Sequence, residues 1–484
     1  PSSYLRKAIL DTALGRCDFV GFILSPEMMK KTFSMGEDGD SFTHRSAQHI
    51  KLFPFTANNN ATIVTSFSSV IGEWLRLCSN QNTVPESMES ALDKLADAMD
   101  DISTYEKSQL LQITRNIYWS NDEKHSLRPK SVTSMRYIPC DDQTELKTAQ
   151  YLYSVLGEEQ DLKSAIEKAV EHATKESNVL EKALFEALEA KSQPLPRIDP
   201  YYVVHLAPQK LFMQDLNFIL KTTARTKEYL VDLLEFYYFF YTSQTCLALS
   251  RFEHGDQEQI VPLYFSLDWE KTNKARECYQ SGWLRLLPAI KQLFYHAITL
   301  EILNQNPTGA QFDYIALQDY VKKTGAEEEI AEQIRRVTDM YRNAISDCSE
   351  LNNLQKNEQR GPVFSEIDYL YESVRTQFKN TGRGRVSDGY VKHFETFCHD
   401  RFLKSRGASG LMLNITEEFL IFLTKLAIHD EEKMSLNEVF RQFEMRGIYL
   451  DQPSKDEVVQ FYTKLNLIEK KSDSGDAQYV RRIL

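Results

Sequence analysis

The stretch Ser435-Leu-Asn-Glu-Val-Phe-Arg-Gln-Phe443, followed by Gly447, decides how the C-terminal part of this chain folds. Ser435 and Glu438 have the spacing of a capping box, and the apolar residues after them recur at helical spacing. Gly447 stands where a helix needs a left-handed C-terminal residue. The stretch therefore predicts one helix with a defined start and a defined end.

Two further helices and a hairpin are expected around this helix. Asn414 and Ser454 each stand three residues before a glutamate, and so predict the starts of a preceding and a following helix. Short strands are expected over Leu467–Lys471 and Gln478–Ile483, joined by the turn-rich residues 472–476. Three helices followed by a hairpin form the order of a winged helix-turn-helix.

A winged helix-turn-helix over residues 412–484 would place its third helix in the DNA major groove and its hairpin along a phosphate strand. The third helix is not basic, because Asp456 and Glu457 offset its lysines. A unit that docks on protein instead of DNA is the alternative. The candidate DNA-binding residues of this unit are Lys455, Gln460, Lys464, Lys470, Lys471, Arg481 and Arg482.

A second basic stretch precedes this unit. Lys379 to Arg406 carries seven basic and three acidic residues, whereas the whole chain has a formal net charge of -12. Aromatic residues interleave with these charges at helical spacing. The excess charge predicts contact with DNA phosphates, and the alternative is a solvated helix face above buried aromatic rings. The candidate DNA-binding residues here are Arg383, Arg385, Lys392, Lys404 and Arg406.

The length of 484 residues predicts about three folding units. Helices that are apolar on nearly all faces, such as the one expected over 227–250, indicate a buried multi-helix bundle. We therefore expect a mainly α-helical protein with a helical trunk and a C-terminal winged helix. The expected divisions are a mixed, mostly helical domain over 1–150, a central bundle over 151–375, a basic connecting segment over 376–411 and the winged helix over 412–484.

The cysteines are scattered singly, without a C-x-x-C pair. This pattern is typical of a reduced, cytoplasmic protein without a zinc site or a disulfide framework. We expect no cofactor. We also expect no membrane contact, because no apolar stretch reaches the about 20 residues that a bilayer crossing needs. The seven cysteines are Cys17, Cys78, Cys140, Cys246, Cys278, Cys348 and Cys398.

Catalytic motifs are mostly missing from the sequence. No glycine is followed by lysine, so the chain has no Walker A loop and cannot be a P-loop ATPase by itself. Metal-dependent nuclease chemistry needs clustered carboxylates and a lysine, and Asp141, Asp142, Glu145 and Lys147 supply these types within seven positions. A nuclease centred on these four residues therefore stays an alternative.

Several stretches of the chain resemble the DptG (DndG) family of bacterial DNA phosphorothioation-dependent restriction systems. The resemblance covers about Asp199 to Leu484, and the N-terminal 150 residues match least. The stretches are Phe236–Tyr241, Pro262–Lys271, Gly282-Trp283, Leu300–Asn304, Thr416–Lys425 and Glu469–Val480.

The resemblance implies a cytoplasmic subunit of a three-protein restriction assembly. Such a subunit would work beside DptF-like and DptH-like ATPase subunits, against double-stranded DNA that lacks the host's sulfur-modified backbone. No catalytic residue is implied by the resemblance. We therefore expect a non-catalytic scaffold or DNA-engaging subunit. The alternatives are the metal-dependent nuclease and a protein-interaction scaffold that never touches DNA.

Overall fold

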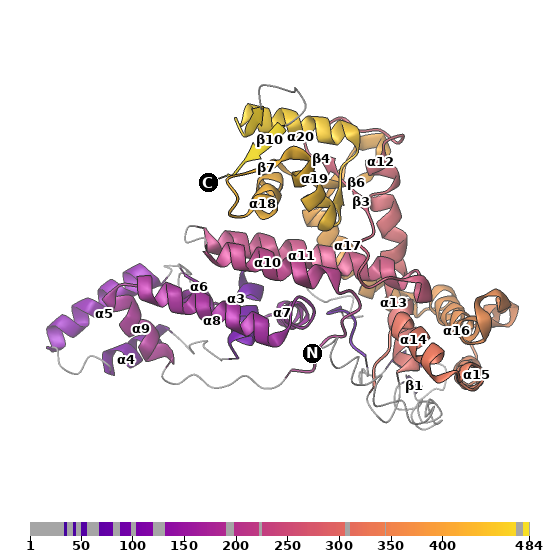
Figure 1. Cartoon of the computed structure of the whole chain (residues 1–484). Coiled ribbons are helices and arrows are strands. Elements are labelled where there is room, and N and C mark those ends of the chain that lie inside the picture. Colours follow the sequence, from indigo (N-terminus) through magenta and orange to yellow (C-terminus); the bar gives the residue numbers. More distant parts are fainter. Residues whose placement is uncertain are drawn as a thin grey trace.

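The computed structural model is mainly α-helical, with long helices packed into a trunk and a smaller mixed unit at the C-terminus (Figure 1). The helical fold class expected from the sequence is confirmed. The structure describes residues 33–35, 42–44, 50–55, 67–80, 88–97, 103–119, 131–189, 198–221, 225–304, 310–343, 345–470 and 478–483.

The N-terminal helices form two groups. One group lies against the trunk and consists of α3 (Phe67–Ser79), α6 (Val132–Met135), α7 (Gln143–Val155) and α8 (Glu159–Glu176). The other group extends away from the trunk (Figure 1) and consists of α4 (Met88–Asp97), α5 (Thr104–Tyr118) and α9 (Val179–Glu189). This second group has a small hydrophobic core that includes Trp119 and Phe185. The strands β1 (Phe33–Met35) and β2 (Phe42–His44) pair antiparallel.

The trunk is organised around α11 (Thr226–Leu249), which contacts α3, α10 (Ala207–Lys221) and α13 (Trp283–Leu303). Every residue of α11 from Phe236 to Leu249 is buried. A helix without a polar face is stable in water only when other elements surround it, so the predicted multi-helix bundle is confirmed. No helix in the described part of the chain, α11 included, combines the length and apolar character that a membrane crossing requires.

The remaining trunk helices follow α13 in the chain. They are α14 (Tyr314–Thr324), α15 (Glu327–Asn343), α16 (Gly361–Asn380) and α17 (Gly384–Arg401), and the short α12 (Glu277–Gln280) precedes α13. Helix α17 differs from the connecting segment expected over 376–411, because it packs on α13 and its aromatic rings are buried. Phe397 lies 4.7 Å, ring to ring, from Tyr238 of α11. The interleaved aromatic residues therefore belong to the core.

The C-terminal unit, defined as α18 to β10, has the order helix, strand, helix, strand, helix, strand, strand. Its helices are α18 (Glu417–Ile428), α19 (Leu436–Met445) and α20 (Gln452–Lys464). The strands β7 (Lys433–Ser435), β9 (Ile468–Lys470) and β10 (Gln478–Arg481) form an antiparallel sheet in the order β7-β10-β9. The helices and strands expected from the sequence are thus present, and the turn expected over 472–476 lies outside the described residues.

Helix α19 begins and ends where the sequence predicted. The hydroxyl of Ser435 accepts a hydrogen bond from the N–H of Glu438 at 3.3 Å. Gly447 has a φ of +75°, the left-handed conformation that favours glycine. A Cβ at Gly447 would lie 2.8 Å from the ring of Phe240 on α11. Glycine is therefore required both by the backbone conformation and by the close approach of this turn to the trunk.

The predicted caps of the other two helices are wrong. Thr416, not Asn414, caps α18, because its hydroxyl accepts a hydrogen bond from the N–H of Phe419 at 3.2 Å. Asp451, not Ser454, caps α20. Asn414 lies in a strand and Ser454 in the first turn of α20, and both side chains bond to trunk residues instead. The two side chains that the local pattern assigned to capping therefore make tertiary hydrogen bonds instead.

Short strand pairs connect the C-terminal unit to the trunk. The strand β8 (Ile448–Tyr449) pairs in parallel with β3 (Leu263–Tyr264). One core of buried hydrophobic residues also extends from Ile50 to Val480 through both parts. The C-terminal unit is therefore continuous with the trunk. The strand that leads into this unit is also paired: β6 (Leu411–Ile415) pairs in parallel with β4 (Ser266–Leu267) and antiparallel with β5 (Leu403–Ser405).

Candidate nucleic-acid interface and its junctions with the trunk

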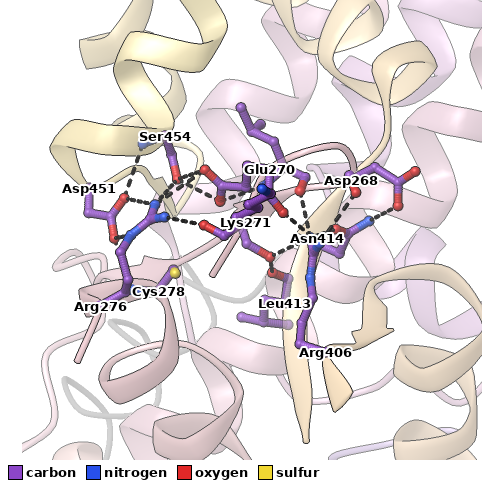
Figure 2. Close-up of polar contacts among 12 residues, drawn as sticks. Asp268, Glu270, Lys271, Arg276, Cys278, Arg406, Leu413, Asn414, Asp451 and Ser454 are labelled. Carbon is purple, nitrogen blue, oxygen red and sulfur yellow. Dashed lines mark hydrogen bonds and ion pairs between the residues drawn. The ribbon is translucent and has the colours of Figure 1, made fainter. Parts of the chain in front are cut away.

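The helix α20 begins in a polar junction with the trunk (Figure 2). Asp451 accepts hydrogen bonds from the Arg276 guanidinium, with a Nε–Oδ2 distance of 2.8 Å, and from the N–H of Ser454 at 3.2 Å. Arg276 also donates to Glu270 at 3.2 Å and to the Ser454 hydroxyl at 2.9 Å. The same hydroxyl donates to Glu270 at 2.9 Å. The start of α20 is thus held by trunk residues.

The carboxylate of Asp451 is ionised at neutral pH. Burial by itself raises its pKa, but the hydrogen bonds from Arg276 and Ser454 outweigh burial and lower the pKa to about 2. The free N–H groups and partial positive charge at a helix N-terminus favour an anion. In α20 this anion is the internal carboxylate of Asp451, so the helix start is already occupied.

Arg406 forms a second junction, beside the paired strands β4 and β6 (Figure 2). Asn414 and Lys404 both donate to the carboxylate of Asp268, at 3.3 and 2.5 Å. The expectation that Arg406 binds phosphate is corrected, because its guanidinium holds the trunk segment 266–270 against β6. Its acceptors are Ser266 Oγ, Leu267 O, Asp268 O, Glu270 O and Asn414 Oδ1, at distances between 2.5 and 3.3 Å.

A buried ion pair forms a third junction. Arg446, at the end of α19, donates to Asp215 of α10 at 2.5 and 3.0 Å, and neither side chain is exposed. Asp215 also accepts from the Tyr237 hydroxyl at 2.7 Å and lies 2.8 Å from His429 Nε2. Burial raises the pKa of Asp215, but Arg446 and these hydrogen bonds lower it below its usual value. The pair therefore stays charged inside the protein.

The candidate residues of the basic stretch fall into two groups. Arg383 donates to Asp347 at 2.8 Å, and Lys404 belongs with Arg406 to the second junction. Arg385 and Lys392 lie on the exposed side of α17. Neither forms an ion pair within the described part of the chain. They are the two candidate residues of this stretch that remain available to a phosphate.

The candidate residues of α20 also divide into one that is paired with an internal acid and two that are exposed. Lys455 lies 3.3 Å from Glu444 and sits over the ring of Phe440, 5.2 Å from its centre. Gln460 and Lys464 are exposed near the end of the helix. The sequence predicted all three as contacts, and the geometry leaves the last two open to solvent.

On the hairpin, Arg482 is exposed and Arg481 lies 3.4 Å from Glu469. Lys470 is the last residue of β9. Lys471 lies outside the described residues. The hairpin therefore contributes one exposed arginine without an ion pair, as far as the structure describes it, and one that is loosely paired.

Two of the three carboxylates considered for a nuclease, Asp142 and Glu145, have structural partners. Asp142 caps α7 and accepts hydrogen bonds from the N–H groups of Thr144 and Glu145, at 2.7 and 3.1 Å. The Glu145 carboxylate accepts a hydrogen bond from the Ser69 hydroxyl. Among the residues that the structure describes, no group of three or more His, Cys, Asp or Glu side chains is arranged to hold a metal ion.

Two acids of α11 titrate close to neutral pH. Burial raises the pKa of Asp232 to about 6 and the pKa of Glu235 to about 7. Arg401 of α17 lies 3.3 Å from Glu235 and offsets only part of this effect. The charge between α11 and the end of α17 therefore changes with pH near neutrality.

The sequence interpretation missed the residues that fix the C-terminal unit. Asp215 is an acid among the apolar residues of α10, a pattern that signals a buried partner. No such local signal marks Arg446, Arg276 or Glu270, because the partner of each lies more than 170 residues away in the sequence.

A comparison with protein-family models and with curated proteins finds no match for this chain. Function is therefore inferred from the junctions, the exposed cations and the sequence motifs.

Proposed function

We propose that this chain is a non-catalytic scaffold subunit of a DNA restriction assembly and that it contacts duplex DNA through a few exposed cations. The observation that carries the proposal is the fixed attachment of the C-terminal unit to the trunk. The Arg446–Asp215 and Arg276–Asp451 pairs and a shared core hold this unit in one orientation. A recognition surface on a rigid support suits a subunit that positions partners.

The charge distribution supports weak contact with phosphates. Arg385, Lys392, Lys464 and Arg482 are exposed and form no ion pair within the described residues. The net charge of -12 repels DNA at a distance, so any binding must come from such local groups. We therefore expect low affinity that falls steeply as salt is added.

The resemblance to the DptG (DndG) family provides the biological setting of the proposal. In this setting the chain belongs to a DNA phosphorothioation-dependent restriction system that acts on unmodified DNA. ATP hydrolysis of the P-loop type would come from DptF-like and DptH-like partners, because this chain has no Gly-Lys pair and hence no Walker A loop.

Copurification tests the scaffold role. The chain, tagged and expressed with the ATPase-type subunits encoded beside it, should elute with them as one complex by size-exclusion chromatography. A chain that elutes alone at every salt concentration contradicts the role in an assembly.

A salt series tests the contact with DNA. The affinity of the full chain for a labelled duplex should fall linearly on a log-log plot against salt concentration, with about 0.9 of slope for each phosphate contact. Changing Arg385, Lys392, Lys464 and Arg482 to Gln should lower the slope. The matched control changes four exposed lysines of α8 and α14 to Gln, namely Lys168, Lys175, Lys322 and Lys323, and should leave the slope unchanged.

Protein docking without DNA contact is the second candidate function. It is favoured by the internal ion pairs of Arg383, Lys404 and Lys455, because a cation that is paired with an internal acid is less available to a phosphate. Copurification with the partners combined with no retention of DNA at low salt would support this candidate and reject DNA contact.

A further inference from the structure

We infer that the C-terminal unit contacts duplex DNA along one outer edge, formed by the end of α20 and the end of β10, and that the contact is independent of base sequence. This inference deepens the proposed function and rests on it. It assigns the contact to the sugar-phosphate backbone and excludes reading of the major groove by the start of α20.

The start of α20 faces the trunk. In helix-turn-helix proteins the N-terminal residues of the recognition helix contact the base edges. Here Asp451 and Ser454 face Arg276 and Glu270 instead (Figure 2). The side chains of Asp451 and Arg276 are only 10% and 12% exposed. Trunk residues therefore occupy the place that a DNA base pair would need.

The exposed side chains near the start of α20 do not suit DNA either. Gln452 donates a hydrogen bond to Asp456 at 2.8 Å, so its amide is engaged by an acid on the same helix face. Lys455 is engaged by Glu444. A carboxylate that faces the groove is repelled by the phosphates on both sides of it. The first two turns of α20 thus lack the charge that groove entry requires.

Cations gather at the opposite end of the unit. The N–H of Arg481 donates to the carbonyl of Leu467 at 2.9 Å, so the end of β10 lies against the turn that follows α20. Lys464 is the last residue of α20, three residues before Leu467, and Arg482 follows Arg481 directly. The edge therefore carries Lys464, Arg481 and Arg482 within one short region.

The chemistry of this edge fits phosphates. Lysine and arginine bind phosphate oxygens through charge and hydrogen bonds, and such contacts carry no sequence information. One acid limits their number, because the Glu469 carboxylate lies 3.4 Å from the Arg481 guanidinium. Each phosphate contact contributes about 0.9 to the slope of log affinity against log salt concentration, so at most three contacts contribute about 2.7.

The experiment uses the full chain and two duplexes of equal length and unrelated sequence. We expect affinities for the two duplexes within about threefold of each other, because sequence-specific sites bind at least about 10³-fold tighter than other DNA. The double variant Lys464→Gln/Arg482→Gln should reduce the salt slope by about 1.8. Gln452→Ala, Asp456→Asn and Gln460→Ala should leave the ratio of the two affinities unchanged. Lys168→Gln/Lys323→Gln is the charge-matched control.

The outcomes separate the inference from the proposed function. A wild-type chain that binds DNA but prefers one sequence by about 10³-fold, or loses a preference when Gln452 or Gln460 is changed, overturns the inference alone. DNA binding that is unaffected by Lys464→Gln/Arg482→Gln also overturns it. A wild-type chain that retains neither duplex at low salt rejects the proposed DNA contact itself, and the inference with it.

Discussion

At the scale of single residues, Arg446 shows how a buried charge can determine the position of a whole unit. Each of its five N–H groups has an acceptor: the two oxygens of Asp215, the carbonyl and side-chain oxygens of Gln442, and the carbonyl of Leu426. A buried guanidinium is tolerated only when its charge and its hydrogen bonds are compensated. Any other orientation of the C-terminal unit would leave this arginine without its counter-charge, because Asp215 belongs to the trunk while Gln442 and Leu426 belong to the unit itself.

Removing one member of this pair should be costly. Asp215→Ala leaves Arg446 buried without its counter-charge and should lower the free energy of unfolding by about 3–5 kcal/mol, measured by urea denaturation. The double variant Asp215→Leu/Arg446→Met should recover most of this loss. The control is Asp430→Ala, which breaks the exposed pair with Lys221 between the same two parts and should cost less than about 1 kcal/mol. Equal losses for Asp215→Ala and Asp430→Ala would contradict this view.

The pKa of Glu235 gives a pH dependence of known sign. Its pKa of about 7 in the folded protein exceeds the ordinary value of 4.5, so the folded state binds the proton more tightly than the unfolded state. The protonated Glu235 carboxyl therefore makes its full contribution to the free energy of unfolding below about pH 4.5, and this contribution is lost as the pH rises through about 7. Glu235→Gln should therefore reduce the loss of stability between pH 5 and pH 8 by on the order of 1 kcal/mol.

Urea denaturation at the two pH values checks this expectation. Glu228→Gln is the matched control, because it makes the same change at an exposed position of the same helix. It should leave the pH dependence unchanged. An identical response of the two variants would show that burial of Glu235 does not raise its pKa.

At the scale of helices and strands, the sequence predicted the regular elements but not the tertiary contacts that they make. The continuous apolar character of α11 and the apolar periodicity of α19 predicted these helices, because both are local properties of the sequence. The ladders that attach the C-terminal unit could not be predicted, since β3, β4 and β8 have two residues each and show no alternation. Their pairing depends on segments about 150 to 185 residues away in the chain.

The candidate site was predictable only in part for the same reason. Net charge along the sequence correctly marked a basic stretch, yet the acids that pair with it lie elsewhere in the chain. Arg383 pairs with Asp347 and Lys404 with Asp268. A local count of charges cannot separate such residues from Lys392, which stays exposed.

The turn at Gly447 gives a prediction for one element. Gly447→Ala adds a Cβ at a positive φ and places it 2.8 Å from the ring of Phe240. Gly325→Ala, at the end of α14, meets the same backbone strain with nothing within 4 Å. Denaturation should show that Gly447→Ala costs about 1–3 kcal/mol more than Gly325→Ala, because only the first also overpacks a contact. Similar costs for both would mean that the turn does not press on α11.

At the scale of the whole molecule, the C-terminal unit and the trunk share one hydrophobic core, the parallel pair of β3 and β8, and the ion pairs Arg446–Asp215 and Asp451–Arg276. Cooperative unfolding of both parts follows from such continuity, since neither can lose its contacts without exposing the core of the other. A unit held in this way cannot swing toward a substrate on a linker. Such a fixed unit suits the role proposed for this chain, which is to position partners relative to the trunk.

Incubation of the purified chain with unmodified duplex DNA and Mg²⁺ or Mn²⁺ tests the non-catalytic role most directly. We expect the duplex to remain uncut at all times, because Asp142 caps a helix and Glu145 is bonded to Ser69. Metal-dependent cleavage that persists through purification and disappears in the variant Glu145→Gln would contradict the account and identify the chain as a nuclease.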